Sequence, residues 1–356
     1  MSGQKKGCII LGSGGLVSQR LQQRLSNHPF FELIGIIGSP KSVGKNLRDL
    51  PWNLDEKRPE LPDLIVLGMD TGVEFALKNN VDIIFSALPS TIAAKCEPLF
   101  VNIGCRVYSN ASQHRMDSNV PLIIPEVNSD HLEILGLNEP GIICSTNCTV
   151  MPVALSIKPI QDKIKIKHIS INTEQSVSGG GLELLISTRL GNTPSPEIPG
   201  EAMKIKEELI RLLSKRQKQT EIKPVFNVDV NCKRVKRDFG HMVHIEIESE
   251  TSVTLEWIIE QWKLFNSKNY VNLPSSPIPL IIIQEEIDPE KDRWAGASLK
   301  NPNPSKDLRA GMSIIVTKPE IIGTKIQWSA FSENTIRGAA GGCVLLAELD
   351  YFRQRE

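Results

Sequence analysis

The chain has 356 residues, which is enough for two domains of ordinary size. Its 41 lysines and arginines equal its 41 aspartates and glutamates, so no net charge attracts nucleic acid or an anionic membrane. No apolar stretch reaches the ~18 residues that a membrane span needs. Glycines break the apolar run after Lys5 and Lys6, which argues against a signal peptide. Seven cysteines without a C-x-x-C pair argue against a disulfide framework or a zinc knuckle and fit a reducing cytoplasm.

The first part of the chain alternates strand and helix patterns. Apolar runs at 6–12 and 31–37 flank a helical pattern over 15–27, which predicts a strand–helix–strand unit with parallel strands. The pattern continues with strands at 64–69, 81–88 and 106–110 and a helix at 91–104. We therefore predict a Rossmann-type dinucleotide-binding domain over 1–146.

The pattern changes near residue 146. Residues 164–176 and 241–249 alternate polar and apolar, as expected for a sheet covered on one side. Amphipathic helices are predicted at 200–217 and 253–266, and one long helix at 334–354. The sequence thus predicts a mixed α/β domain over 147–330 and a terminal segment, 331–356, that returns to the first domain.

A glycine-rich turn separates the first strand from the first helix. A dinucleotide fold needs such a turn so that the backbone and the helix N-terminus can approach the pyrophosphate. The residues predicted to bind the cofactor here are Gly12, Ser13, Gly14, Gly15, Leu16 and Val17. Val17 occupies the last glycine position of the strict motif, so an ordinary glycine turn remains an alternative.

The second strand is followed by a turn without a carboxylate. Ser39, Lys41 and Ser42 could hold a 2′-phosphate there, which favours NADP over NAD. An ordinary solvated turn is the alternative.

Cys148 lies between an apolar strand and a helix. A helix N-terminus stabilises a thiolate, and the backbone N–H groups after Cys148 could stabilise an oxyanion, so we predict a nucleophile here. A small core cysteine is the alternative. The nucleophile needs a proton-transfer partner, but the residues alone do not choose between His241 and His244.

Several stretches occur in an order that is specific only in combination. They are SPKSVGK at 39–45, SALPS at 86–90, YSNASQHRM at 108–116, VPLIIPEVN at 120–128, STNCTV at 145–150, QSVSGGG at 175–181, a CKRV…GH stretch ending at His241, and NTIRGAAGG at 334–342. This combination resembles the aspartate-semialdehyde dehydrogenase family, especially its archaeal and fungal branch. The resemblance covers about residues 7 to 350.

The resemblance implies a fold like that of glyceraldehyde-3-phosphate dehydrogenase, with a Rossmann-type domain and a mixed α/β catalytic and dimerisation domain. It implies an NADPH-dependent reduction of aspartyl phosphate to aspartate semialdehyde and phosphate, in lysine, threonine and methionine biosynthesis. It also implies a homodimer or homotetramer.

The resemblance further implies roles for individual residues. Cys148 would be the nucleophile, His241 the general acid/base, and Gln175 would orient the thioester. In the substrate site, Arg115 and Lys204 would bind phosphate, Glu201 the ammonium and Arg234 the α-carboxylate, with Asn147 beside them. Further cofactor ligands would be Ser86, Leu88, Ser178, Gly179 and Asn334. Gly14, Ser18 and Glu333 depart from the family's pattern and leave room for another acyl substrate.

Three rival functions remain. A malonyl-CoA reductase would not need Glu201 for an ammonium. An inactive regulatory relative would bind NADP only, and a generic NAD-binding module would have no thiol chemistry.

Overall fold

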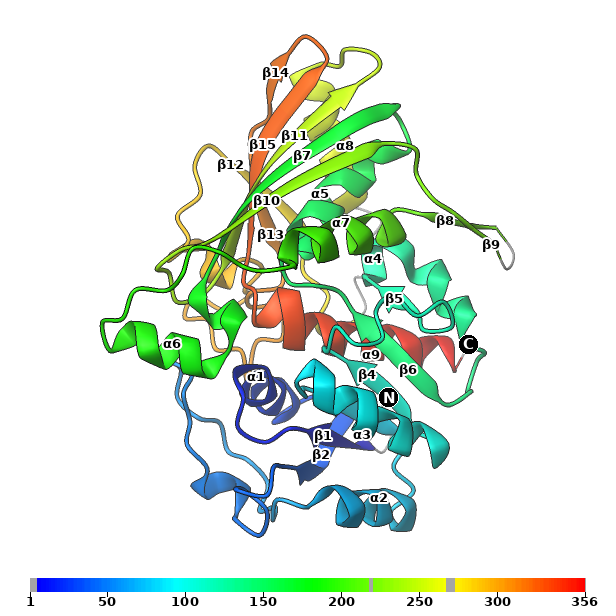
Figure 1. The fold of residues 1–356 in the computed structure, drawn as a ribbon, viewed down its shortest axis with the longest axis vertical. Helices are drawn as coiled ribbons and strands as arrows, with labels where there is room; N and C mark the ends of the chain where they lie inside the picture. The colour runs from blue at the N-terminus through cyan, green and yellow to red at the C-terminus, as the bar shows by residue number, and fades with distance from the viewer. Residues whose placement is uncertain (1–4, 218–219, 267–272, 356) are drawn as a thin grey trace.

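The computed structural model describes residues 5–217, 220–266 and 273–355, which form two sheets with helices around them (Figure 1). The first sheet has six parallel strands in the order β2-β1-β3-β4-β6-β5. They are β1 (Lys6–Leu11), β2 (Phe31–Ile37), β3 (Ile83–Ser86), β4 (Arg106–Ser109), β5 (Leu122–Ile123) and β6 (Gly141–Ser145). This arrangement confirms the predicted Rossmann-type sheet.

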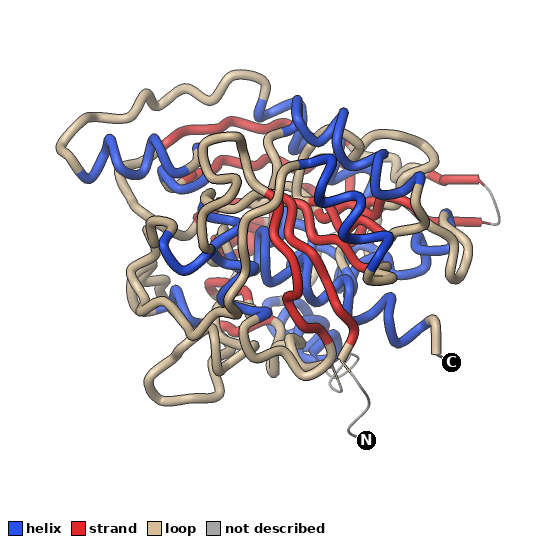
Figure 2. Tube along the Cα trace, turned by 90° about the horizontal axis from the view of Figure 1, so that it is seen from below, coloured by secondary structure: helices blue, strands red, loops and turns tan. Residues whose placement is uncertain are grey.

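Helices cover both faces of this sheet (Figure 2). Alternate residues of β1 explain why: Cys8 and Ile10 point to one apolar cluster, and Ile9 and Leu11 to another. The first cluster includes α1 (Leu16–Leu25) and α9 (Gly341–Arg353), and the second includes α2 (Met69–Lys78) and α3 (Ser90–Asn102). The C-terminal helix therefore packs on the first sheet. None of the helices within the described ranges is long and apolar enough to cross a membrane.

The strand predicted at 64–69 was wrong. The backbone of Leu67 bonds to Ile36 and Gly38 at the end of β2, but the segment makes only isolated bridges, and α2 already begins at Met69. Gly68, in extended conformation, directly precedes α2. The helix therefore begins before the segment can form a longer series of strand hydrogen bonds.

The second sheet is mixed, with the order β10-β7-β11-β15-β13-β12 and β14 paired to β15. Its strands are β7 (Ile166–Gln175), β10 (Asn227–Arg234), β11 (His241–Ser249), β12 (Ile281–Gln284), β13 (Ile314–Thr317), β14 (Glu320–Ile322) and β15 (Lys325–Ser332). Helices α5 (Val150–Gln161), α7 (Glu201–Leu212) and α8 (Leu255–Asn266) pack on one face and enclose the largest apolar cluster. The other face carries the polar members of the alternating strands, as the sequence pattern predicted.

The remaining elements are short. They are α4 (Pro125–Asn128), α6 (Leu182–Arg189), a hairpin of β8 (Lys215–Gln217) and β9 (Thr220–Ile222), the tight 3₁₀ turns η1 (Leu47–Asp49), η2 (Ser129–Ile134), η3 (Val177–Gly180) and η4 (Asp292–Trp294), and the π-helical turn η5 (Ile336–Ala340).

Two predicted helices were too long. The helix expected over 200–217 ends at Leu212, and its last three residues form β8. The helix expected over 334–354 begins with η5, a wider π-helical turn, because glycines there pack closely on their neighbours. A side chain at Gly338 would meet Cβ of Cys148 at 2.5 Å. The close packing of this turn thus brings the terminal segment directly against the predicted nucleophile.

Candidate active site

A cavity of about 380 Å³ lies at the edge of the first sheet where its parallel strands end. Segments that follow β3, β4 and β6 contribute to its wall, and the second domain closes it from the other side. The predicted site residues that line it are Val17, Leu88, Arg115, Asn147, Cys148, Gln175, Ser178, Gly179, Glu201, Lys204, Arg234 and Asn334. Residues from opposite halves of the sequence thus meet in one cavity.

Cys148 and His241 form a hydrogen-bonded pair. Cys148 lies between β6 and α5 and is partly exposed, while His241 opens β11 and is fully buried behind it. The Sγ–Nε2 distance is 3.2 Å. His244, three residues later on the same strand, points to the other face and bonds to Ser329 Oγ at 2.8 Å. The structure therefore selects His241 as the partner of the thiol.

The pKa shifts of both residues favour a neutral resting pair. Burial foremost, and then the Glu201 carboxylate, raise the pKa of Cys148 to about 12, although Arg115 and Arg234 act the other way. Burial also lowers the pKa of His241 to about 3, with Arg234 and Arg237 acting in the same direction. The expected thiolate stabilisation by the helix N-terminus is therefore outweighed in the free protein.

Two backbone donors of the expected oxyanion site after Cys148 are already occupied in the free protein. The N–H of Thr149 donates to Asn147 Oδ1 at 2.7 Å, and the N–H of Val150 donates to the carbonyl of Asn147 at 3.1 Å. Asn147 thus occupies both donors itself. Gln175 also lines the cavity, and within the described residues its side-chain amide makes one long bond, from Nε2 to Thr173 Oγ1 at 3.4 Å.

Charged side chains of both signs surround the thiol. Glu201 and Lys204 begin α7 and line the cavity, and Asn147 Nδ2 holds the Glu201 carboxylate at 2.8 Å. Arg234 ends β10, and its Nη1 donates to the carbonyl of Ser176 at 2.9 Å. The cavity can therefore accommodate a ligand that carries both an ammonium and anionic groups.

Arg115 is held by Glu208, which sequence reasoning missed. Arg115 Nη1 lies 3.0 Å from Glu208 Oε1, and both side chains are buried. The other carboxylate oxygen accepts the hydroxyl of Thr146 at 2.9 Å and the N–H of Asn147 at 2.7 Å. Glu208 thus ties the predicted phosphate ligand to the segment just before Cys148. Its position seven residues after Glu201, on the same face of α7, was the available signal.

The glycine turn fits a dinucleotide phosphate. Gly12 has φ of 99°, and a Cβ at Gly14 or Gly15 would meet open space. Ser18, the departure from the family pattern, is buried and donates to the carbonyl of Gly12 at 2.7 Å, so it stabilises the turn. Leu16 packs into an apolar cluster beneath the turn.

The predicted 2′-phosphate ligands lie beside this turn and outside the cavity wall. Ser13 Oγ and Ser42 Oγ are 3.0 Å apart, which joins the glycine turn to the turn after β2. Ser39 and Lys41 are exposed. Ser86, at the end of β3, is buried, and its Oγ has no hydrogen-bond partner within the described part of the chain. These residues fit a nucleotide that enters along the strand ends.

Comparisons with known proteins agree with this geometry. Residues 8–135 match the family model described as "Semialdehyde dehydrogenase, NAD binding domain". A relative from Archaeoglobus fulgidus named aspartate-semialdehyde dehydrogenase is 33% identical over 350 residues, which cover 96% of each chain. The chain belongs to the aspartate-semialdehyde dehydrogenase family.

Two further relatives bear on this family assignment. The crystal structure of aspartate semialdehyde dehydrogenase with NADP from Candida albicans superimposes with a TM-score of 0.81 at 26% identity and covers 99% of both chains. Archaeal and fungal members of the family are thus both similar to this chain, which confirms the predicted branch. A relative from Metallosphaera sedula named malonyl CoA reductase (NADP) is 31% identical and covers 96% of this chain and 95% of its own.

Proposed function

We propose that this chain is an NADP-dependent oxidoreductase that reduces L-4-aspartyl phosphate to L-aspartate 4-semialdehyde and releases phosphate. The observation that carries the proposal is Cys148 in the wall of a cavity lined by Arg115, Glu201 and Arg234, with His241 buried behind it at 3.2 Å. Aspartyl phosphate carries an ammonium, a carboxylate and a phosphate, and each needs a partner of opposite charge.

The substrate is bound by separate charged groups. Glu201 receives the ammonium, since Asn147 already fixes its carboxylate. Arg234 receives the α-carboxylate, and its planar guanidinium can donate two parallel hydrogen bonds. Arg115 and Lys204 receive the phosphate. This arrangement directs the acyl carbon toward Cys148.

The chemistry passes through a thioester. The sulfur of Cys148 attacks the acyl carbon, the bond to the phosphate oxygen breaks, and Arg115 and Lys204 neutralise the leaving group. Gln175 orients the thioester carbonyl. After reduction, His241 gives a proton to the sulfur as the thiohemiacetal collapses to the aldehyde.

The glycine turn and the neighbouring serines would hold the cofactor. The turn over Gly12 to Val17 binds the pyrophosphate, and Ser39, Lys41 and Ser42 bind the 2′-phosphate. Ser86 and Leu88, at and after the end of β3, lie on the other side of the glycine turn, toward the cavity. Ser178, Gly179 and Asn334 lie on the nicotinamide side. Bound NADPH supplies the hydride for the reduction.

We also propose that the chain self-associates through the polar face of its second sheet. The polar face of the second sheet carries the exposed Asn172 and His244, while α5, α7 and α8 cover the opposite face. A homodimer through this face, or a homotetramer, would cover it, and light scattering on the purified protein would measure its mass. The seven cysteines are all unpaired, which supports a reducing compartment such as the cytoplasm.

The decisive experiment is NADP reduction with aspartate semialdehyde in the presence and absence of phosphate. We expect turnover only with phosphate and no turnover by Cys148→Ala. Oxidation of NADPH by malonyl-CoA, tested in parallel, should not exceed the Cys148→Ala background, because Glu201 has no ammonium to bind there. Malonyl-CoA as the better substrate would instead assign the reaction of the Metallosphaera sedula relative. NADP binding without turnover on either substrate would indicate a regulatory relative.

A further inference from the structure

The first observation concerns the nitrogen of His241 that faces away from Cys148. The backbone N–H of Ser176 donates to His241 Nδ1 at 3.1 Å, and Ser176 Oγ lies 3.2 Å from the same nitrogen. A peptide N–H can only donate, so Nδ1 must hold a lone pair in this arrangement. The proton of the neutral ring is then on Nε2, which faces the sulfur of Cys148 at 3.2 Å.

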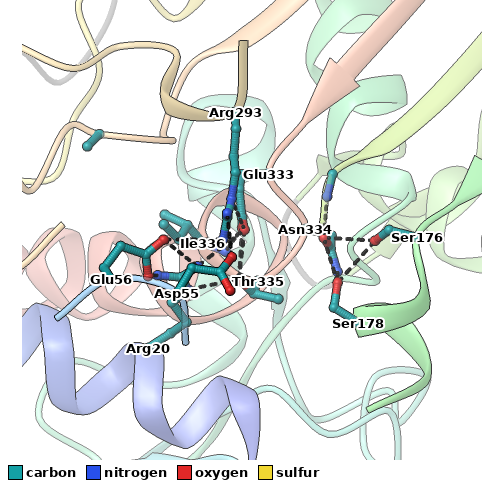
Figure 3. Close-up of polar contacts among 12 residues, drawn as sticks. Arg20, Asp55, Glu56, Ser176, Ser178, Arg293, Glu333, Asn334, Thr335 and Ile336 are labelled. Carbon is teal, nitrogen blue, oxygen red and sulfur yellow. Dashed lines mark hydrogen bonds and ion pairs between the residues drawn. The ribbon is translucent and has the colours of Figure 1, made fainter. Parts of the chain in front are cut away.

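The second observation concerns the direction of the Ser176 hydroxyl. Asn334 Oδ1 accepts the N–H of Gly240 at 2.8 Å, which fixes the orientation of the amide. The same oxygen accepts Ser176 Oγ at 3.1 Å. Ser176 Oγ also lies 3.1 Å from Ser178 Oγ. When the hydroxyl proton is given to Asn334 Oδ1, a lone pair of Ser176 Oγ faces Nδ1. Figure 3 shows Asn334 directed toward Ser176 and Ser178.

Asn334 is itself firmly held. Glu333, the residue before it, turns the other way and accepts the N–H of Ile336 at 2.6 Å and the hydroxyl of Thr335 at 2.9 Å (Figure 3). The buried Arg20 and the partly buried Arg293 lie within 3.6 Å of the same carboxylate. The departure from the family pattern at Glu333 therefore belongs to the support that holds Asn334 in place.

We propose that Ser176 is a positioning residue that sets the protonation of His241, so that the resting ring is protonated on Nε2 and donates to the sulfur of Cys148. When the ring carries two protons, its Nδ1–H and the Ser176 N–H are both donors and cannot hydrogen-bond to each other. The Ser176 hydroxyl oxygen then accepts the Nδ1–H. The two polar groups of Ser176 thus serve two protonation states of one histidine. The inference rests on the proposed function only where it concerns turnover.

This arrangement determines which group takes the proton of the Cys148 thiol. Nε2 of the resting ring already carries a proton, so it cannot accept another from Cys148. As the S–C bond forms and the C–O bond to phosphate breaks, the thiol proton passes to the departing phosphate oxygen. His241 acts in the later step. Its ring takes a second proton from solvent, the proton that reduction by NADPH consumes, and gives the Nε2 proton to the sulfur as the thiohemiacetal alkoxide collapses to the aldehyde.

The charged and titratable groups that act on His241 come from three elements: Cys148 before α5, Arg234 at the end of β10, and Arg237 in the turn that follows. Both arginines disfavour the doubly protonated ring. The acceptor at Ser176 Oγ is therefore needed when the ring takes its second proton.

Nitrogen NMR of the full-length protein labelled with ¹⁵N-histidine tests the resting state without any substrate. The His241 signals are identified by their loss in His241→Gln. We expect Nδ1 to resonate as an unprotonated nitrogen and Nε2 as a protonated one near neutral pH. A resting ring protonated on Nδ1 would overturn the proposal, whether or not the protein reduces aspartyl phosphate.

Ser176→Ala tests the hydroxyl, because the variant keeps the backbone N–H. Loss of one charge-assisted hydrogen bond should move the alkaline limb of the kcat profile to lower pH by about one unit. KM and the thermal midpoint should stay near wild type, and Ser176→Thr, which keeps a hydroxyl, should restore the profile. An unchanged profile in Ser176→Ala would refute the role of the hydroxyl, since a merely structural residue would not shift it selectively.

Discussion

The two ends of the cleft differ in how they are held before a ligand binds. Around Cys148, buried hydrogen bonds from Asn147, Glu208 and Ser176 fix the catalytic segment and its histidine. At the cofactor end, Lys41 is exposed and the turn at Gly14 opens to free space. Groups that must act within a few tenths of an ångström are thus fixed in advance, whereas groups that bind a phosphate from solution remain accessible.

The largest expected effect is at Cys148, in the part of the cleft that is fixed before a ligand binds. Cys148→Ala removes the nucleophile, so kcat should fall by roughly a thousandfold or more. NADP affinity, measured by isothermal titration calorimetry, should stay near wild type because the thiol does not hold the turn at Gly14. Retention of more than a few per cent of turnover would rule out the covalent mechanism.

The pH dependence of thiol alkylation comes next. Since burial raises the pKa of Cys148 to about 12, the reactive thiolate fraction should increase about tenfold per pH unit, or about a hundredfold between pH 6 and pH 8. Inactivation by iodoacetamide in the absence of ligands measures this rate. Glu201→Gln should react faster at every pH because Glu201 raises the thiol pKa. A rate that levels off near neutral pH would instead indicate a preformed thiolate–imidazolium pair.

Arg234 tests the substrate end of the cleft. Arg234→Lys keeps the charge but cannot form two parallel hydrogen bonds, and a charged hydrogen bond contributes ~1.5–3 kcal/mol. We expect kcat/KM for aspartate semialdehyde to fall by about tenfold to a hundredfold. Aldehydes without the α-carboxylate should be equally poor substrates for both proteins. Wild-type kinetics in the variant would place Arg234 outside the substrate site and favour the malonyl-CoA reductase alternative.

The smallest effect is expected at the accessible end. Lys41→Ala removes one exposed cation, so the NADP/NAD ratio of kcat/KM should fall by about tenfold, while kinetics with NAD stay unchanged. Lys45→Ala, a nearby lysine in the same turn, is the matched control. An equal response of both variants, or an unchanged ratio, would contradict the assignment of Ser39, Lys41 and Ser42 to the 2′-phosphate. Their role stays a prediction until then, as do the domain boundaries at 146 and 330.

Local sequence determined the features that depend on neighbouring residues. The strand–turn–helix pattern around Gly12 and the strand–helix junction at Cys148 could both be read directly, because each depends on residues a few positions apart. The segment 64–69 was misread because a short apolar run does not reveal whether a second strand is there to pair with it. The helix over 334–354 was predicted to be regular along its whole length, because the sequence does not show that Gly338 packs against Cys148, far away in the chain.

Only the tertiary structure decided which distant groups meet. His241 and His244 lie on opposite faces of β11, as period-two geometry requires, but only packing shows that His241 faces the sulfur, 93 positions away. The helical spacing of Glu208 from Glu201 does not reveal its partner, and nothing local singles out Ser176. Both residues matter because of the buried partners they hold, Arg115 and His241. The sequence alone therefore determined the type of chemistry, whereas the fold determined the protonation and position of the groups that perform it, because these depend on burial and long-range hydrogen bonds.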